Sequence, residues 1–153
     1  KKHIMLEGEK ATIYSRLLEH KFPDYESVIP KTNEKKIVLD IDKYIQSTKR
    51  IGIFANDSSQ LIVFTITENK MNISAEDKSI SSSAREEIEV EYSGEDFKIA
   101  YNNSKLKEVL RHIDGEKLKI YLNTPLTAGL FFPYEQEEDE DALFLLMPLR
   151  TSD

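Results

Sequence analysis

The sequence predicts an α+β fold in which two helices pack on one side of antiparallel sheets. The order β-α-β-β-β occurs twice, and the two helices begin near residues 41 and 103. The pattern predicts eight strands and only two helices, so the sheets should bury one face beneath both helices. The recurrence is a duplicated architecture without obvious residue identity between the halves. A chain of 153 residues accommodates one domain, or one domain with part of a neighbour.

The first segment predicts a hairpin followed by an irregular stretch. Residues 4–6 and 11–18 read as two short strands around the turn 7–10. Pro23 and Pro30 lack an N–H donor and restrict the residues before them, so residues 22–30 should be extended. This stretch is interpreted as a linker with packed aromatic residues.

The first β-α-β-β-β unit begins with a strand at 36–39. Asp40 is a good N-cap, and Asp42 favours the positive end of the helix predicted over 41–54. Strands follow at 61–67, 71–75 and about 85–91, in which apolar residues alternate with polar ones most clearly at 71–75.

The second unit repeats this order. A strand at 96–101 leads to a helix capped by Asn102 or Asn103 and running to about Asp114, with Gly115 closing it. Three further strands are predicted, at 117–122, 126–132 and 143–149.

The acidic charge of the chain is local. The net charge is −7, but residues 135–141 hold six acids and residues 86–91 hold four more. Without those ten acids the rest of the chain carries +3, so the average charge does not describe every face.

The absence of cysteine excludes disulfides and thiolate chemistry. No apolar run approaches the roughly 20 residues of a spanning helix, and a cytoplasmic protein without membrane partners is expected.

No motif supports catalysis, a metal or a cofactor. Asp40 and Asp42 could form a metal-binding pair, but two acids at a helix start more often cap it. The acidic run 135–141 has no calcium-loop signature and favours a solvated loop. The three histidines are widely separated, and neither a Gly-x-Ser-x-Gly elbow nor a phosphate loop is present.

Two other surfaces could carry function. Basic residues on both predicted helices could meet DNA phosphates without reading bases, although solvent faces of helices are commonly rich in lysine. The nearly apolar tail 143–150 favours a buried terminal strand by its periodicity, with an exposed peptide groove as the alternative.

Three segments together resemble the bacterial sliding clamp, the β subunit of the replicative DNA polymerase III. They are residues 22–31 (FPDYESVIPK), 91–94 (EYSG) and 146–150 (LMPLR), at the expected separation and with the duplicated pattern between them. The resemblance covers nearly the whole chain. It implies the DNA-clamp fold and a C-terminal piece of a three-domain subunit, in which 1–27 is the last hairpin and linker of the middle domain and 28–153 is the third domain.

The resemblance also implies a processivity factor without an active site. Two such subunits would close head to tail into a homodimer ring around double-stranded DNA, in a sequence-independent way. Short hydrophobic motifs of the replicative polymerase, the clamp loader and repair proteins would bind a groove on each subunit. The alternative is a stand-alone α+β peptide-binding module without a DNA role.

The implied site residues form three groups. The peptide groove would be lined by Pro23, Ser27, Val28, Leu126, Ala128, Leu145, Leu146, Met147, Pro148, Leu149 and Arg150. The DNA-facing residues would be Lys43, Lys49, Arg50, Lys105, Lys107 and Arg111. The dimer interface would use Ile53 and Phe54 with an acidic strand, Glu86, Glu87, Glu89 and Glu91, opposite a basic partner strand.

Overall fold

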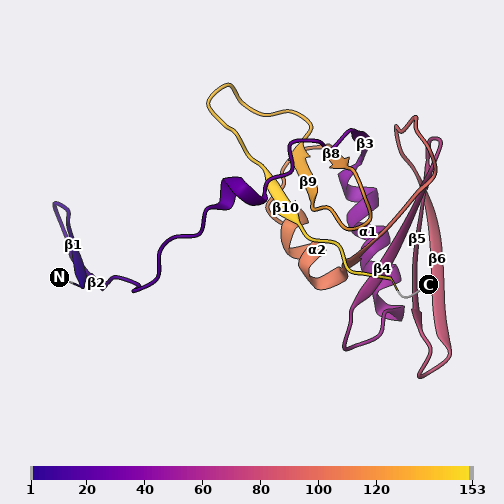
Figure 1. Cartoon of the computed structure of the whole chain (residues 1–153), viewed down its shortest axis with the longest axis horizontal. Helices are drawn as coiled ribbons and strands as arrows, with labels where there is room; N and C mark the ends of the chain where they lie inside the picture. Colours follow the sequence, from indigo (N-terminus) through magenta and orange to yellow (C-terminus); the bar gives the residue numbers. More distant parts are fainter. Residues whose placement is uncertain (1, 152–153) are drawn as a thin grey trace.

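The computed structural model describes residues 2–151, which form a hairpin, a connecting segment and a larger α+β body (Figure 1). The hairpin pairs β1 (His3–Glu7) with β2 (Thr12–Arg16), as predicted. A single 3-10 turn, η1 (Tyr25–Val28), interrupts the connecting segment. Every residue from 2 to 28 is exposed, and the hairpin lies well away from the body. Within residues 2–151, the aromatic residues of this segment therefore do not pack on the body as expected, although Phe22 and Tyr25 contact each other edge to face.

The body contains the predicted duplication. The first unit is β3 (Lys35–Asp40), α1 (Ile41–Ile51) with η2 (Gly52–Phe54), β4 (Leu61–Thr67), β5 (Lys70–Asp77) and β6 (Ser82–Glu89). The second is β7 (Phe97–Asn102), α2 (Asn103–Leu110), β8 (Lys117–Leu122), β9 (Gly129–Pro133) and β10 (Phe144–Leu146). The element order is confirmed in full.

The two units exchange their first strands. One sheet has the order β10-β9-β8-β3 and the other β6-β5-β4-β7, all neighbours antiparallel. The sheets also join at both edges, where Val38 and Glu91 exchange backbone hydrogen bonds and Leu149 N–H donates to Ala100 O at 2.8 Å. Neither unit can therefore complete its sheet without the other, and the body forms one cooperative structure.

Both helices start by the same device. Asp40 Oδ1 accepts from Lys43 N–H at 2.9 Å, and Asn102 Oδ1 accepts from Lys105 N–H at 3.0 Å. Each capping residue is the last residue of a strand, and its side chain accepts a hydrogen bond from a backbone N–H group of the first helical turn. Helix α2 ends at Leu110, before the predicted Asp114, because His112 N–H bonds to Val109 O three residues back and tightens the chain. Gly115, at φ +112°, then reverses the chain toward β8.

Two predicted strands are shorter in the structure. The strand expected at 126–132 starts at Gly129, because the Thr124 hydroxyl accepts from the N–H groups of Leu126 and Thr127 and holds a turn there. The strand expected at 143–149 ends at Leu146, just before Met147-Pro148, since proline cannot donate to the ladder.

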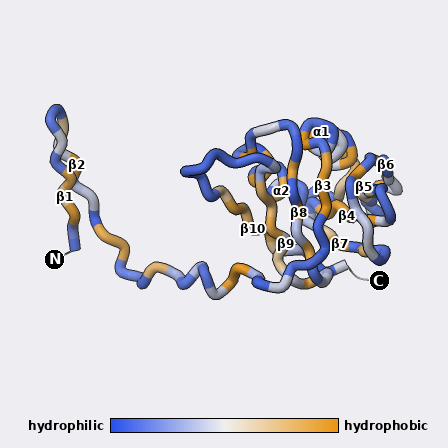
Figure 2. Tube along the Cα trace, turned by 90° about the horizontal axis from the view of Figure 1, so that it is seen from above, coloured by the Kyte–Doolittle hydropathy of each residue, from blue (hydrophilic) through white to orange (hydrophobic). Residues whose placement is uncertain are grey.

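A chain of aromatic side chains connects helix α1 to both sheets. Tyr44 of α1, Phe64 of β4, Tyr101 of β7 and Phe131 of β9 follow one another with ring centroids 5.7, 6.0 and 5.9 Å apart. All four side chains are at most 2% exposed. Helix α1 packs on β5 and β6, α2 packs on β7 and β10, and the helices contact each other. Figure 2 shows the hydrophobic residues concentrated inside the body, with the loop before β10 hydrophilic.

Candidate functional site

The C-terminal segment, residues 143–150, is mostly half-buried. It is therefore neither the fully buried strand nor the fully exposed groove that its sequence allowed. Leu145 lies opposite Leu130 and Leu146 opposite Gly129 in the ladder of β10 with β9. Leu146 packs against the core, whereas Met147 is 59% exposed. Leu126, on the loop before β9, is equally exposed. The structure therefore gathers an apolar rim at this edge of the sheet.

The predicted groove residues do not all contribute to that rim. Ala128 is only 4% exposed, so its side chain belongs to the core more than to an open wall. Pro23, Ser27 and Val28 lie on the connecting segment, where all three are exposed. The Ser27 hydroxyl donates to Asp24 O at 2.7 Å and stabilises η1 rather than a groove. Leu145, Pro148 and Leu149 are half-buried, and Arg150 is exposed.

The predicted DNA-facing residues lie on two helices in contact. Lys43, Lys49 and Arg50 are exposed on α1; Lys105 is exposed on α2, as is Arg111 directly after it, and Lys107 is half-buried. Lys105 pairs with Glu108 at 3.3 Å. Within residues 2–151, no ion pair engages Lys43, Lys49, Lys107 or Arg111. Four cations thus remain available on the helices.

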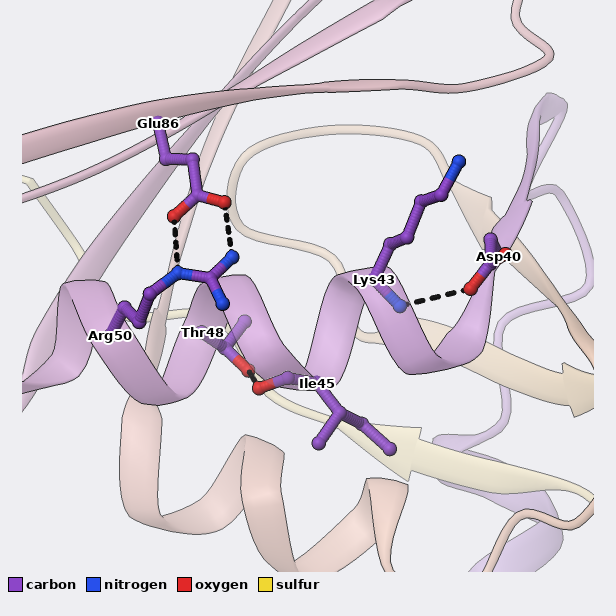
Figure 3. Close-up of polar contacts among 6 residues, drawn as sticks. All are labelled: Asp40, Lys43, Ile45, Thr48, Arg50 and Glu86. Atoms are coloured by element: carbon purple, nitrogen blue, oxygen red, sulfur yellow. Dashed lines mark hydrogen bonds and ion pairs between the residues drawn. The ribbon is translucent and has the colours of Figure 1, made fainter.

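Arg50 has a partner within the chain that sequence reasoning missed. Its guanidinium donates to both carboxylate oxygens of Glu86 on β6, with Nε 3.0 Å from Oε2 (Figure 3). These hydrogen bonds lower the pKa of Glu86, with burial opposing them, and raise the pKa of Arg50. The helix packing explains the pair, because α1 crosses β6 and places Arg50 over the inward-facing position of that strand.

The four acids of the predicted interface strand do not share one face. Glu86 points toward α1, while Glu87 and Glu89 point to the opposite face, because side chains alternate along a strand. Glu87 pairs with Lys70 at 2.8 Å. Glu91 lies beyond β6, bridges to β3 and pairs with Lys117 at 2.7 Å. Glu91 therefore lies outside the strand that was expected to carry it, and Glu86 lies on β6 but faces α1. Ile53 and Phe54, on η2, are 79% and 37% exposed.

Replacing Arg50 by glutamine should raise the pKa of Glu86 toward its ordinary value. A carboxylate whose pKa is depressed by folding adds stability above its unfolded pKa, and this stability is lost as the pH falls through the folded pKa. The stability difference between wild type and R50Q should therefore be present at pH 7 and decrease below about pH 4, as the pH falls toward the depressed pKa of folded Glu86. Carboxyl NMR titration and urea unfolding at both pH values measure these effects. An unchanged Glu86 pKa in R50Q would contradict the role of the pair, and K49Q is the matched control.

The acidic pair that could have held a metal ion has a structural role in the described residues. No group of three or more acidic or histidine side chains gathers there to hold a metal ion. Asp40 serves as a helix cap, which is the interpretation that its position favoured. None of the helices in the described chain is long and apolar enough to span a membrane.

Comparison with known proteins gives a consistent result. Residues 26–150 match the model of the family described as DNA polymerase III beta subunit, C-terminal domain. The beta sliding clamp of Pseudomonas aeruginosa is 29% identical over 148 residues, which are 97% of this chain and 39% of that protein. The chain thus spans about two-fifths of its relative's length.

Solved structures agree with the sequence match. A sliding clamp of P. aeruginosa bound to griselimycin superposes with a TM-score of 0.89 at 28% identity, covering 99% of this chain and 40% of that chain. The DNA polymerase III beta subunit of Thermotoga maritima gives 0.89 at 27% identity, with the same coverage of each chain. With the duplicated units, the two adjacent helices and a family match over residues 26–150, the chain belongs to the DNA polymerase III beta subunit family and carries its C-terminal domain.

Proposed function

We propose that this chain is the C-terminal part of a processivity factor for bacterial DNA replication. The observation that carries the proposal is the family match over residues 26–150 together with the clamp fold. Residues 1–27 would be the last hairpin and linker of the middle domain, and residues 28–153 the third domain. The exposure of every residue from 2 to 28 supports this division, because a hairpin with nothing to pack on belongs to another folding unit.

The DNA contact would use the paired helices. Lys43, Lys49, Lys107 and Arg111 would meet phosphates loosely and without base contacts, which permits sliding. Lys105 and Arg50, which are already paired with Glu108 and Glu86, would contribute less. The head-to-tail ring would place Ile53 and Phe54 against the other subunit, with Glu87 and Glu89 on the outward side of the edge strand β6.

The partner site would be the rim of Leu126 and Met147 with the tail up to Arg150. An apolar cleft with a few polar groups suits a short extended hydrophobic peptide. Pro23, Ser27 and Val28 would add a wall once the middle domain orders the connecting segment. Polymerase, clamp loader and repair proteins would compete here through short motifs. The protein would act by tethering its partners, with no reaction of its own.

Salt-dependent DNA binding tests the DNA part of this proposal. Fluorescence anisotropy with a labelled duplex should show weak, sequence-independent binding at 20 mM salt that disappears by about 200 mM. The double variant K49Q/K107Q should lower the slope of log K against log salt by about 1 to 2, while K10Q on the hairpin turn should not change it. Peptide binding without any DNA binding at low salt would instead support the stand-alone module.

A further inference from the structure

A polar depression lies on the outward face of the sheet β6-β5-β4-β7, next to the end of the proposed peptide site. It encloses about 1450 Å³. On β4, Ile62, Phe64 and Ile66 point into the core, so Leu61, Val63 and Thr65 form the floor of the depression. The face is thus a sheet surface that no other element of the described chain fully covers.

The rim of this depression is basic in an acidic chain. Lys78, Arg85, Lys98 and Arg150 line it, against Glu76 and Asp77. Asp77 is 7% exposed and its carboxylate already accepts from Ser79 N–H, the Ser79 hydroxyl and Asn56 Nδ2 at 2.9, 2.6 and 3.1 Å. These bonds lower its pKa and occupy its oxygens. Lys78, Arg85 and Arg150 outnumber Glu76 and Asp77, so positive charge predominates on this rim in a protein of net charge −7.

Arg85 is the member of the rim best placed for a ligand. It stands opposite Ser74 in the β5–β6 ladder and is exposed. Within the chain that the structure describes, no carboxylate pairs with it, although Glu86 and Glu87 beside it both have basic partners. An exposed guanidinium without a carboxylate partner can bind a ligand carboxylate with two parallel hydrogen bonds.

The depression is continuous with the proposed peptide site. Leu149 N–H donates to Ala100 O at 2.8 Å, which seats the tail on the edge of β7, and Leu149, Arg150 and Thr151 then line the depression. Figure 1 shows the tail running from β10 to the second sheet. At the other end of this segment, the acidic run 135–141 lies in the loop that enters β10. A ligand lying along residues 144–150 therefore meets negative charge at one end and positive charge at the other.

We propose that the partner peptide carries acidic residues on the flank that passes over the tail and that this depression binds them. The proposal rests on the proposed peptide site and adds its selectivity: the hydrophobic motif fills the rim, while Arg85 and Arg150 bind the acidic flank. The charge gradient also fixes the direction in which the peptide lies, because acids on the other flank meet the acidic loop.

Five peptides test this proposal by calorimetry on the whole chain at 50 mM and 300 mM salt. All contain the pattern Gln-Leu-x-Leu-Phe; one is unextended, two carry three glutamates before or after the motif, and two carry three glutamines in the same places. At 50 mM salt, one glutamate peptide should bind about tenfold more tightly than its glutamine counterpart. The other glutamate peptide should bind no more tightly than its own glutamine counterpart. The gain should shrink at 300 mM salt.

The variant R85Q should remove most of that gain and leave binding of the unextended peptide unchanged, while R16Q on the hairpin should change neither. The proposal is overturned if both glutamate peptides bind like their glutamine counterparts, if both gain equally, or if R85Q keeps the gain. Binding of the unextended peptide in any of these cases would leave the proposed function standing. If no peptide binds, the peptide site itself is wrong, and the acidic flank with it.

Discussion

Phe64→Ala should destabilise the body by about 3 to 5 kcal/mol, the largest effect expected of a single substitution. Phe64 is 1% exposed on the central strand pair of its sheet, with Tyr44 and Tyr101 on either side at 5.7 and 6.0 Å. Removing the ring breaks the aromatic chain in the middle and leaves a cavity between α1 and β7. Because the two units share their sheets, both should unfold together.

Urea unfolding followed by circular dichroism measures this loss. Ile80→Ala is the matched control, since Ile80 is 71% exposed at the turn between β5 and β6 and should shift stability by no more than about 0.5 kcal/mol. A loss below about 1 kcal/mol in F64A, or separate transitions for the two units, would contradict the shared core.

Met147→Ala should weaken binding of the peptide Gln-Leu-x-Leu-Phe by tenfold or more while leaving the fold intact. Met147 is 59% exposed, so its removal costs little stability, yet its flexible thioether stands at the centre of the proposed rim. Leu146 is a poorer choice, because it packs against the core and its substitution also perturbs β10.

Calorimetry of M147A beside wild type gives the affinity ratio, and the unfolding midpoint shows that both proteins are folded. Met5→Ala on the exposed hairpin controls for the loss of a surface methionine, since Met5 is 52% exposed. Equal affinities for M147A and wild type would place the peptide elsewhere on the chain.

The order of the elements was predictable because each has a local signal. Asp40 and Asn102 mark strand-to-helix junctions by their capping chemistry, and the predicted strand 61–67 matches the bounds of β4. Strand ends were less predictable. The hydroxyl of Thr124 and the early tightening after Leu110 act through single hydrogen bonds that hydrophobic periodicity does not contain.

Pairing between distant segments was not predictable from one sequence. Nothing local in 35–40 indicates that β3 joins the sheet of the second unit, and the pair Arg50–Glu86 depends on how α1 crosses β6. The alternation of side chains along a strand is enough by itself to separate Glu86 from Glu87 and Glu89. The basic depression had no sequence signal, because its rim comes from three strands, a turn and the tail.

The most direct test of the central claim is calorimetric titration of this chain with the peptide Gln-Leu-x-Leu-Phe, together with NMR mapping of the shifted backbone signals. The proposed clamp domain should bind at about micromolar strength, near −8 kcal/mol, with the shifts gathered at Leu126 and at residues 145–150. Absence of heat and of shifts at millimolar peptide, or shifts confined to other surfaces, would contradict the claim that this chain tethers partners through its C-terminal edge.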